Sequence, residues 1–179
     1  ALRPRVIGLA VYIWNVTQTQ ALVARLKALA PQVRIVLGGP EVSHETEAQA
    51  ICQLADHVVQ GPGDLAFARL ARRLLEGGEP PPRIIAANHP ELATLVLPYR
   101  EYDDTDVRER VLYVEASRGC PFKCEFCLSS LDRTAWPFPL PPFLAEMADL
   151  HRRGARRFKF VDRTFNLKPA TSIAIMEFL

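Results

Sequence analysis

Arg5-Val-Ile-Gly-Leu-Ala-Val-Tyr-Ile-Trp14 is an almost uninterrupted apolar run near the start of the chain. Short apolar runs rich in β-branched residues are typical of strands buried on both faces of a parallel sheet. Similar runs return at Val33-Arg-Ile-Val-Leu37 and at His57-Val-Val59. Segments with helical spacing of apolar residues alternate with them, and the predicted helices are 21–29, 43–54 and 65–75. This alternation predicts an open α/β unit of the Rossmann type.

Three loops follow the predicted strands, at residues 12–16, 38–42 and 60–64. The carboxyl ends of parallel strands meet at one rim of a sheet, where such folds bind ligands. Glycine permits close approach to a ligand or a positive φ, and a tryptophan can stack on a ring. A single glycine after a strand more often serves only the turn, and Tyr12 is expected to pack internally. The candidate contacts are Trp14, Gly38, Gly39, Gly61 and Gly63.

A second pattern lies downstream, in Arg118-Gly-Cys-Pro-Phe-Lys-Cys-Glu-Phe-Cys-Leu128. Cys120, Cys124 and Cys127 are spaced so that their thiolates can converge on one metal centre. Thiolates are the usual ligands of a [4Fe–4S] cluster, which takes four, so three leave one iron open. Only four cysteines in 179 residues argues against a disulfide framework. A zinc site completed by a histidine stays open, although no histidine has close zinc-ligand spacing.

The cysteine pattern follows the apolar strand Val111–Ala116 and resembles the Cys-x3-Cys-x2-Cys signature of the radical S-adenosylmethionine superfamily. Phe126, the aromatic before the last cysteine, fits the signature too. The resemblance implies that Cys120, Cys124 and Cys127 hold a [4Fe–4S] cluster, whose fourth iron binds the amino and carboxylate groups of S-adenosylmethionine. It also implies that Phe126 lies against the adenosyl group, that a flavodoxin or ferredoxin supplies electrons, and that the substrate is a small molecule.

The sequence after the cysteines continues with alternating helices and strands. A proline-rich stretch at 136–142 leads into an apolar-periodic helix that ends near Gly154, then a strand at 157–162 and a helix from Lys168. Together with the strand before the cysteines, this order predicts the first units of a β/α barrel.

Asp162 and Asn166 follow the second of these strands. The radical S-adenosylmethionine family commonly carries a Gly-Gly-Glu motif there that binds the amino group of the cofactor, and this sequence departs from it. Asp162 is the candidate for that contact. Asn166 is either a second contact or the cap of the next helix.

The α/β unit ahead of the cysteines resembles the cobalamin-binding domain of a large radical S-adenosylmethionine class, which includes tetrapyrrole cyclases and methyltransferases. The axial-histidine motif Asp-x-His-x-x-Gly is missing. Its nearest approach is Asp56-His57-Val-Val-Gln-Gly61, in which the histidine directly follows the aspartate and begins a strand. Two interpretations stay open: cobalamin binds with no protein ligand below cobalt, or the domain has lost the cofactor.

These patterns predict an N-terminally incomplete Rossmann domain at 1–80, a proline-rich acidic linker at 81–108, and a C-terminally incomplete start of a barrel at 109–179. We expect the chain to be a piece of a longer polypeptide. A net charge of +2 implies no general field for nucleic acid or membranes. The cysteines suit a reducing compartment, and no apolar run has membrane length, so a cytoplasmic protein is expected.

The predicted function is that of a radical S-adenosylmethionine enzyme. Reductive cleavage would give a 5′-deoxyadenosyl radical that abstracts hydrogen from the substrate, and methyl transfer or ring closure through cobalamin would follow. The alternative is a non-catalytic module that carries a cluster or zinc, with a sheet that binds a corrinoid or a partner. Cys52 is expected to be a small buried hydrophobe.

Overall fold

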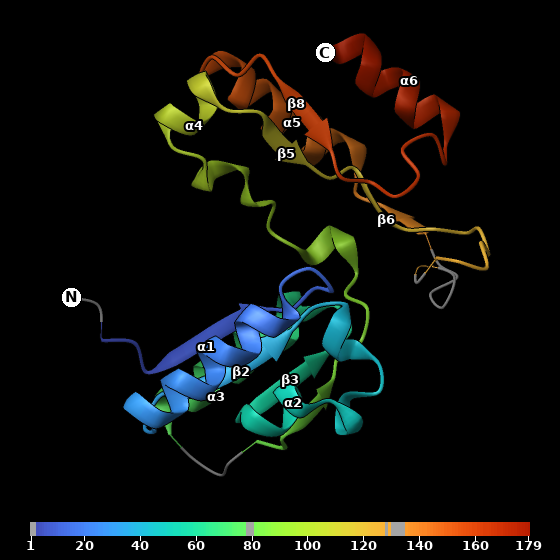
Figure 1. Cartoon of the computed structure of the whole chain (residues 1–179). Coiled ribbons are helices and arrows are strands. Elements are labelled where there is room, and N and C mark those ends of the chain that lie inside the picture. The colour runs from blue at the N-terminus through green and yellow to red at the C-terminus, as the bar shows by residue number, and fades with distance from the viewer. Residues whose placement is uncertain (1–2, 78–80, 128, 130–134) are drawn as a thin grey trace. The chain divides into compact units, whose positions relative to one another are not determined.

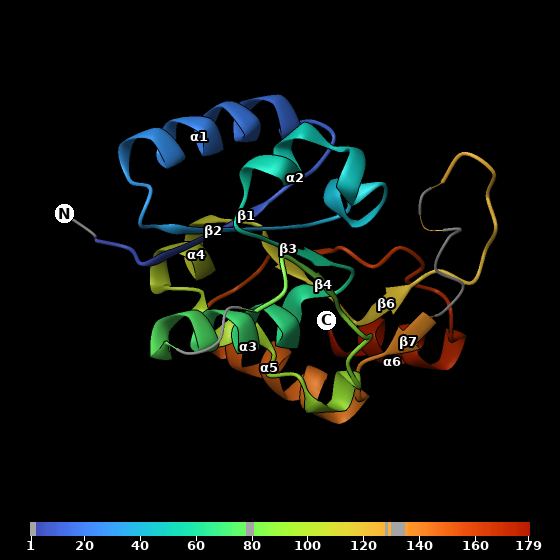
Figure 2. The same cartoon turned by 90° about the horizontal axis from the view of Figure 1, so that it is seen from below.

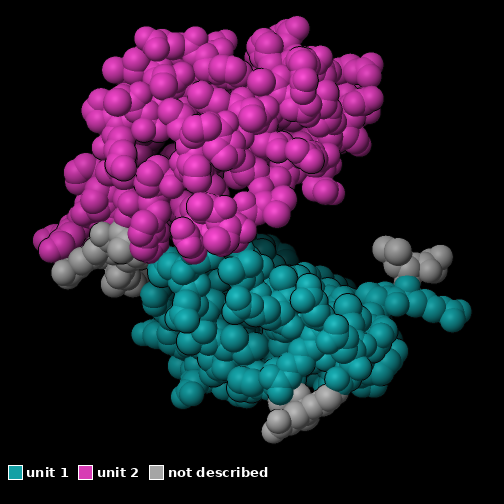
Figure 3. Space-filling model, turned by 180° about the vertical axis from the view of Figure 1, so that it is seen from behind, with its two compact units in different colours: residues 1–90 teal, residues 91–179 magenta. Residues whose placement is uncertain are grey.

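The computed structural model describes residues 3–77, 81–127, 129 and 135–179. The chain divides into two compact units, residues 1–90 and residues 91–179, which are coloured separately in Figure 3. Gly78, Glu79 and Pro80, the last residues of the predicted Rossmann domain, lie outside the described residues.

The first unit is a parallel sheet covered by helices on both faces, which confirms the predicted α/β class. The strands are β1 (Val6–Ala10), β2 (Arg34–Gly38), β3 (His57–Gln60) and β4 (Ile84–Ala86), and they pair in that order. The helices are α1 (Val16–Leu29), α2 (Ala50–Leu54) and α3 (Gly63–Glu76). Figure 2 shows α1 and α2 on one face of the sheet and α3 on the other.

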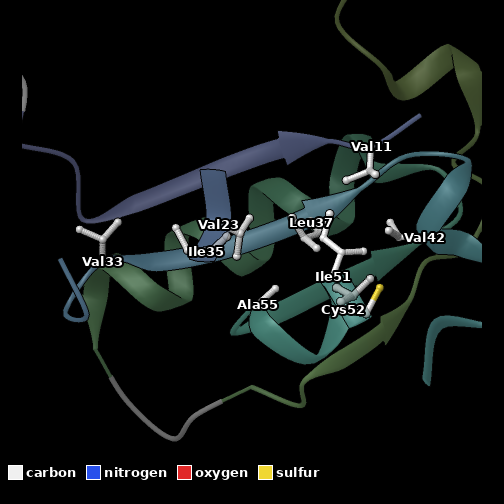
Figure 4. Close-up of a cluster of buried hydrophobic side chains, with 10 residues drawn as sticks. Val11, Val23, Val33, Ile35, Leu37, Val42, Ile51, Cys52 and Ala55 are labelled. Carbon is white, nitrogen blue, oxygen red and sulfur yellow. The ribbon is translucent and has the colours of Figure 1, made fainter. Parts of the chain in front are cut away.

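Side chains of the central strands alternate between two apolar clusters, one on each face of the sheet. Ile35 and Leu37 pack with Val23 of α1 and with α2 (Figure 4). Val36, between them in sequence, joins a second cluster with Leu70 of α3. Burying one such side chain is worth about 1.5–3 kcal/mol. Burial on both faces is why these strands are continuous apolar runs.

The predicted helix over 43–54 is wrong for its first half. That segment forms two 3-10 turns, Glu41–Ser43 and Thr46–Ala48, and α2 begins only at Ala50. Ser43 does not cap a helix: its hydroxyl donates to the carbonyl of Gly39. The Thr46 hydroxyl likewise donates to the carbonyl of Val42. Side chains that bond to nearby backbone compete with helix formation, and here they prevail.

The structure also differs from the linker predicted over 81–108. Ile84–Ala86 is the edge strand β4, paired with β3. The segment from 91 onward belongs to the second unit and contains η3 (Leu92–Thr94), η4 (Pro98–Glu101) and α4 (Asp104–Glu109). The acidic residues that suggested a linker form a capping box, in which Asp103 and Asp106 each accept from the other's backbone N–H.

Two tyrosines of this segment dock along β5 (Leu112–Val114). The Tyr99 hydroxyl accepts from the Glu115 N–H and donates to its carbonyl. The Tyr102 hydroxyl makes the same pair of bonds with Tyr113. Burial raises the pKa of Tyr99 to about 12, so this hydroxyl keeps its proton and remains a donor. The two hydroxyls thereby satisfy the backbone N–H and carbonyl groups of Tyr113 and Glu115.

The second unit contains one strand–helix–strand crossover. β5 pairs in parallel with β8 (Phe158–Phe160), and α5 (Leu140–Arg152) connects them in sequence. β6 (Ser117–Gly119) pairs antiparallel with β7 (Ala135–Pro137), and α6 (Pro169–Phe178) follows β8 (Figure 1). Phe143, Met147 and Leu150 of α5 are buried in its core. The order β5, α5, β8 and α6 is the predicted one, whereas the β6–β7 pair was not predicted and the barrel itself stays a prediction.

No helix in the described parts of the chain has both the length and the apolar character needed to cross a lipid bilayer.

Asp56 ties α1, β2 and β3 together at the amino ends of the strands. Its carboxylate accepts from Lys27 Nζ at 3.0 and 2.9 Å, from Arg34 Nη1 at 3.3 Å and from the Ile35 N–H at 2.8 Å. Burial opposes ionisation of Asp56, but the bonds from Ile35, Lys27 and Arg34 outweigh it and lower the pKa of the carboxyl.

We therefore expect Asp56→Asn to lower the free energy of unfolding at pH 7 by about 1–2 kcal/mol. A carboxyl whose pKa is lowered by folding stabilises the protein fully above its unfolded pKa of about 3.9, and this contribution is lost as pH falls through the folded value. Urea denaturation between pH 7 and pH 3 measures both effects. Glu47→Gln, at an exposed carboxylate of the same unit, is the control, and equal acid sensitivity of Asp56→Asn and wild type would contradict the assignment.

Candidate functional site

The three predicted loops, two of which contain glycine, meet at the carboxyl ends of β1, β2 and β3. The Val11 N–H donates to the Gly38 carbonyl at 2.8 Å, and the Glu41 N–H donates to the Val11 carbonyl at 3.3 Å. Ser43 then joins the second loop to the third: its hydroxyl donates to the Gly39 carbonyl at 2.8 Å and accepts from the Gly61 N–H at 3.0 Å. These bonds bring Gly38, Gly39 and Gly61 together on one rim.

The loop after β1 presents an aromatic surface at this rim. Trp14 is 72% exposed and stacks on Tyr12, with ring centroids 4.6 Å apart and planes 9° from parallel. Asn15 fixes the loop, because its side chain accepts from the Tyr12 N–H at 2.8 Å and donates to the Ala10 carbonyl at 3.1 Å. A large aromatic held in place and left mostly in water is suited to stacking on a flat ligand.

The glycines of the rim have different reasons to be glycine. Gly39 has φ 107°, and a Cβ there would lie 2.6 Å from the carbonyl oxygen of Val11. Gly61 has φ 79°. Both are required by the backbone. A Cβ at Gly63 would meet no atom within 4 Å, and one at Gly38 only the Val59 carbonyl at 3.7 Å. Gly63 and Gly38 are therefore the glycines whose lack of a side chain leaves open space beside the rim.

His57 cannot serve as an axial ligand at this rim. It begins β3, so it lies at the amino end of the sheet, where it is buried with Nδ1 3.0 Å from the Pro82 carbonyl oxygen. The neighbouring Asp56 is engaged by Lys27 and Arg34.

The cysteine loop (residues 120–127) follows β6 in the second unit. None of the four cysteines is in a disulfide; Cys120 and Cys127 are partly buried and Cys124 is exposed. The Cys127 N–H donates to the Cys124 carbonyl at 3.1 Å, which closes a β-turn. Such a turn brings the α-carbons of its end residues within about 7 Å. Phe126, inside the turn, is 95% exposed.

The loop does not gather its thiols tightly in this structure. Among the described residues, no group of three or more His, Cys, Asp or Glu side chains is placed to hold a metal ion. The donor chemistry nevertheless suits an iron–sulfur cluster, because three cysteines that are not in disulfides lie on one short segment.

Both oxygens of Asp162 are engaged by the segment that leads into the cysteine loop. Oδ2 accepts from the Ala116 N–H at 3.0 Å, and Oδ1 accepts from the Ser117 hydroxyl at 2.6 Å. The capping role considered for Asn166 is wrong: the N-cap of α6 is Lys168, and the helix begins with Pro169, which needs no partner for an N–H.

Two functional candidates were not predicted from the sequence. The Thr164 hydroxyl donates to Cys120 Sγ at 3.3 Å, and Arg163 Nη1 donates to the Ser129 hydroxyl at 2.5 Å. The only signal available in the sequence was proximity, because both residues directly follow Asp162, the predicted cofactor contact. Arg118, which lies two residues before Cys120 in the sequence, forms an ion pair with Glu115, with Nε 2.9 Å from Oε2.

The sequence matches known proteins in both units. Residues 1–71 match the model of the B12 binding domain family. Uncharacterized methyltransferase PH0819 from Pyrococcus horikoshii is 29% identical over 196 residues, which cover 96% of this chain and 42% of that protein. Uncharacterized methyltransferase sll1242 from Synechocystis sp. is 31% identical over 158 residues, covering 84% of this chain and 28% of that protein. The chain therefore spans less than half the length of these relatives.

Two solved structures of the radical S-adenosylmethionine methyltransferase TsrM from Kitasatospora setae share this fold. One has tryptophan substrate and a SAM analog bound, and the other has cobalamin and a [4Fe-4S] cluster bound. Each aligns with a TM-score of 0.68 at 17% identity, covering 98% or 97% of this chain and 40% of TsrM. The chain thus has a B12-binding-type α/β unit at residues 1–71, sequence relatives named as methyltransferases, and the fold of part of a radical S-adenosylmethionine methyltransferase.

Proposed function

We propose that this chain is part of a radical S-adenosylmethionine enzyme that uses cobalamin, with methyl transfer as its reaction. The observation that carries the proposal is the pairing of a B12-binding-type domain with a downstream loop that carries three cysteines, none of them in a disulfide, at Cys-x3-Cys-x2-Cys spacing. The relatives named as methyltransferases favour methyl transfer over ring closure.

In this proposal Cys120, Cys124 and Cys127 ligate a [4Fe–4S] cluster and leave its fourth iron for S-adenosylmethionine. The turn that joins Cys124 to Cys127 already sets two of the ligands close together. Phe126, exposed within that turn, is then available to lie against the adenosyl group. Both carboxylate oxygens of Asp162 accept hydrogen bonds from the segment before the cysteine loop, so Asp162 supports this loop and does not contact the cofactor.

The glycine loops are the proposed cobalamin site. Trp14 offers a fixed aromatic face, and Gly63 and Gly38 leave open space at the ends of the neighbouring loops. Since His57 lies at the other end of the sheet, cobalamin would bind at this rim without that histidine.

When bound, the cofactors supply reductive cleavage of S-adenosylmethionine to a 5′-deoxyadenosyl radical and a cobalt centre able to carry a methyl group. The chain's own residues hold the cluster by thiolate ligation, orient the adenosyl group and seat the corrin ring. A small-molecule substrate and an external electron donor such as flavodoxin or ferredoxin complete the proposed system.

The proposal is tested by anaerobic reconstitution with iron and sulfide, addition of a low-potential reductant and S-adenosylmethionine, and measurement of 5′-deoxyadenosine by chromatography. Formation that depends on both the reductant and the cluster is the expected result. A zinc-loaded protein, or an iron-loaded one that forms no 5′-deoxyadenosine, would favour the non-catalytic module.

Trp14→Ala is expected to weaken binding of cobalamin to the chain by about tenfold, equivalent to about 1.4 kcal/mol, because a stacking surface is lost. Stability should change by less than about 0.5 kcal/mol, since the ring is mostly in water. Titration of cobalamin followed by its visible absorbance measures the affinity. Leu29→Ala, an exposed apolar truncation on the same unit, is the control, and equal affinity of Trp14→Ala and wild type would remove Trp14 from the site.

A further inference from the structure

Three consecutive residues after β8 bond to the cysteine loop and to the segments on both sides of it. Asp162 accepts from the Ala116 N–H and the Ser117 hydroxyl, ahead of the loop. Thr164 donates to Cys120 Sγ, at its first cysteine. Arg163 donates to the Ser129 hydroxyl, beyond its last cysteine.

These contacts are long-range in sequence and differ in chemistry. Asp162 lies 45 and 46 positions from its two donors, and Thr164 lies 44 positions from Cys120. A carboxylate with two donors makes charge-assisted bonds, which are among the stronger ones in proteins. Segments held at several points by such bonds lose conformational freedom before a ligand binds, which lowers the entropic cost of binding.

The bond from Thr164 to Cys120 has a further consequence. The hydroxyl donates its only proton to a sulfur that ligates iron in the proposed function. A donor to a cluster sulfur withdraws negative charge from it and stabilises the reduced state, which carries one more electron.

We propose that Asp162, Arg163 and Thr164 are positioning residues that hold the cysteine loop for cluster assembly, and that the Thr164 hydroxyl raises the reduction potential of the cluster through Cys120. The redox part rests on the proposed function. The positioning part concerns the protein without any cofactor.

Amide hydrogen exchange on the cofactor-free chain tests the positioning. Asp162→Ala removes both acceptors, and exchange at Ala116 and across the cysteine loop is expected to accelerate about tenfold or more. Asp162→Asn keeps one acceptor oxygen and should give a smaller increase. Asp149→Ala on α5 is the matched control for global destabilisation, and exchange in Asp162→Ala no faster than in this control would overturn the positioning role.

Redox titration of the reconstituted cluster tests Thr164. Thr164→Val keeps the shape and removes the donor, and Thr164→Ser restores the donor. At a fixed applied potential, Thr164→Val should lower the ratio of reduced to oxidised cluster by about threefold to tenfold, tenfold being about 59 mV for one electron. Thr164→Ser should return it toward wild type, and Thr105→Val, at an exposed threonine on α4, should leave it unchanged.

Different results would overturn the proposed function and the redox role of Thr164. If wild type takes up no iron, the proposed function fails and the redox role of Thr164 fails with it, while the exchange experiment still decides the positioning. If Thr164→Val binds wild-type iron and titrates at the wild-type potential, the redox role is overturned and the proposed function stands.

Discussion

Cys124→Ala is expected to abolish assembly of the cluster, reducing the iron of the reconstituted chain from about four per molecule to a background level. Two thiolates on one loop leave two irons without protein ligands, and such a cluster is readily lost. The same variant should form no 5′-deoxyadenosine. Iron and sulfide assays after desalting, with the broad absorbance near 400 nm as a second readout, check the result.

Cys52→Ala is the matched control, because it makes the same substitution in the same chain at a buried thiol of α2. Burial raises the pKa of the Cys52 thiol, despite the opposing effect of the Arg83 guanidinium, so this thiol stays protonated near neutral pH. Its variant should retain wild-type iron. Full iron content in Cys124→Ala, or its loss in Cys52→Ala, would show that the cysteine loop is not the cluster site.

Gly39→Ala is expected to destabilise the first unit by about 2–4 kcal/mol. An alanine there must adopt φ near 107° and place its Cβ 2.6 Å from the Val11 carbonyl oxygen and 2.9 Å from the Val11 nitrogen. Both contacts are with backbone, so relief requires β1 and β2 to separate at their carboxyl ends. Thermal and urea denaturation followed by circular dichroism measure the loss.

Gly63→Ala tests whether this glycine is needed for ligand binding, because the backbone does not require a glycine at this position. Its Cβ meets no atom within 4 Å, and its φ is not positive, so stability should stay level or rise by about 0.5–1 kcal/mol through the better helix propensity of alanine. Cobalamin affinity should nevertheless fall if the corrinoid approaches this backbone closely. A stable Gly39→Ala protein would refute the steric account, and undiminished cobalamin affinity in Gly63→Ala would move the ligand away from that glycine.

Strand positions were the easiest part of the fold to predict from sequence. The runs around Ile35 and Val58 contain β-branched residues that must be buried on both faces, and no other element of that length does this. The helix expected over 43–54 failed because Ser43 and Thr46 bond to backbone carbonyls, a choice decided by the neighbouring strand ends and invisible to helical periodicity. The segment after residue 91, which was expected to be part of a linker, instead packs in the second unit, where Tyr99 and Tyr102 bond to the backbone at β5. Its composition does not reveal this tertiary contact.

Some residues of the candidate site could be proposed from the sequence, and others could not. Spacing alone was enough to propose Cys120, Cys124 and Cys127 as ligands, because ligands of one metal centre can be close in sequence. Thr164 was missed because its partner Cys120 is 44 positions away and a single threonine has no distinctive pattern. Trp14 was ambiguous between packing and binding until its exposure and its stacking on Tyr12 were known.

The most direct test of the central claim is the electron paramagnetic resonance spectrum of the reduced, anaerobically reconstituted chain with and without S-adenosylmethionine, alongside assays of iron, sulfide and zinc. The account predicts about four irons per chain and a spectrum that changes when S-adenosylmethionine is added, because its amino and carboxylate groups bind the open iron. Stoichiometric zinc, or a cluster whose spectrum ignores S-adenosylmethionine, would contradict it.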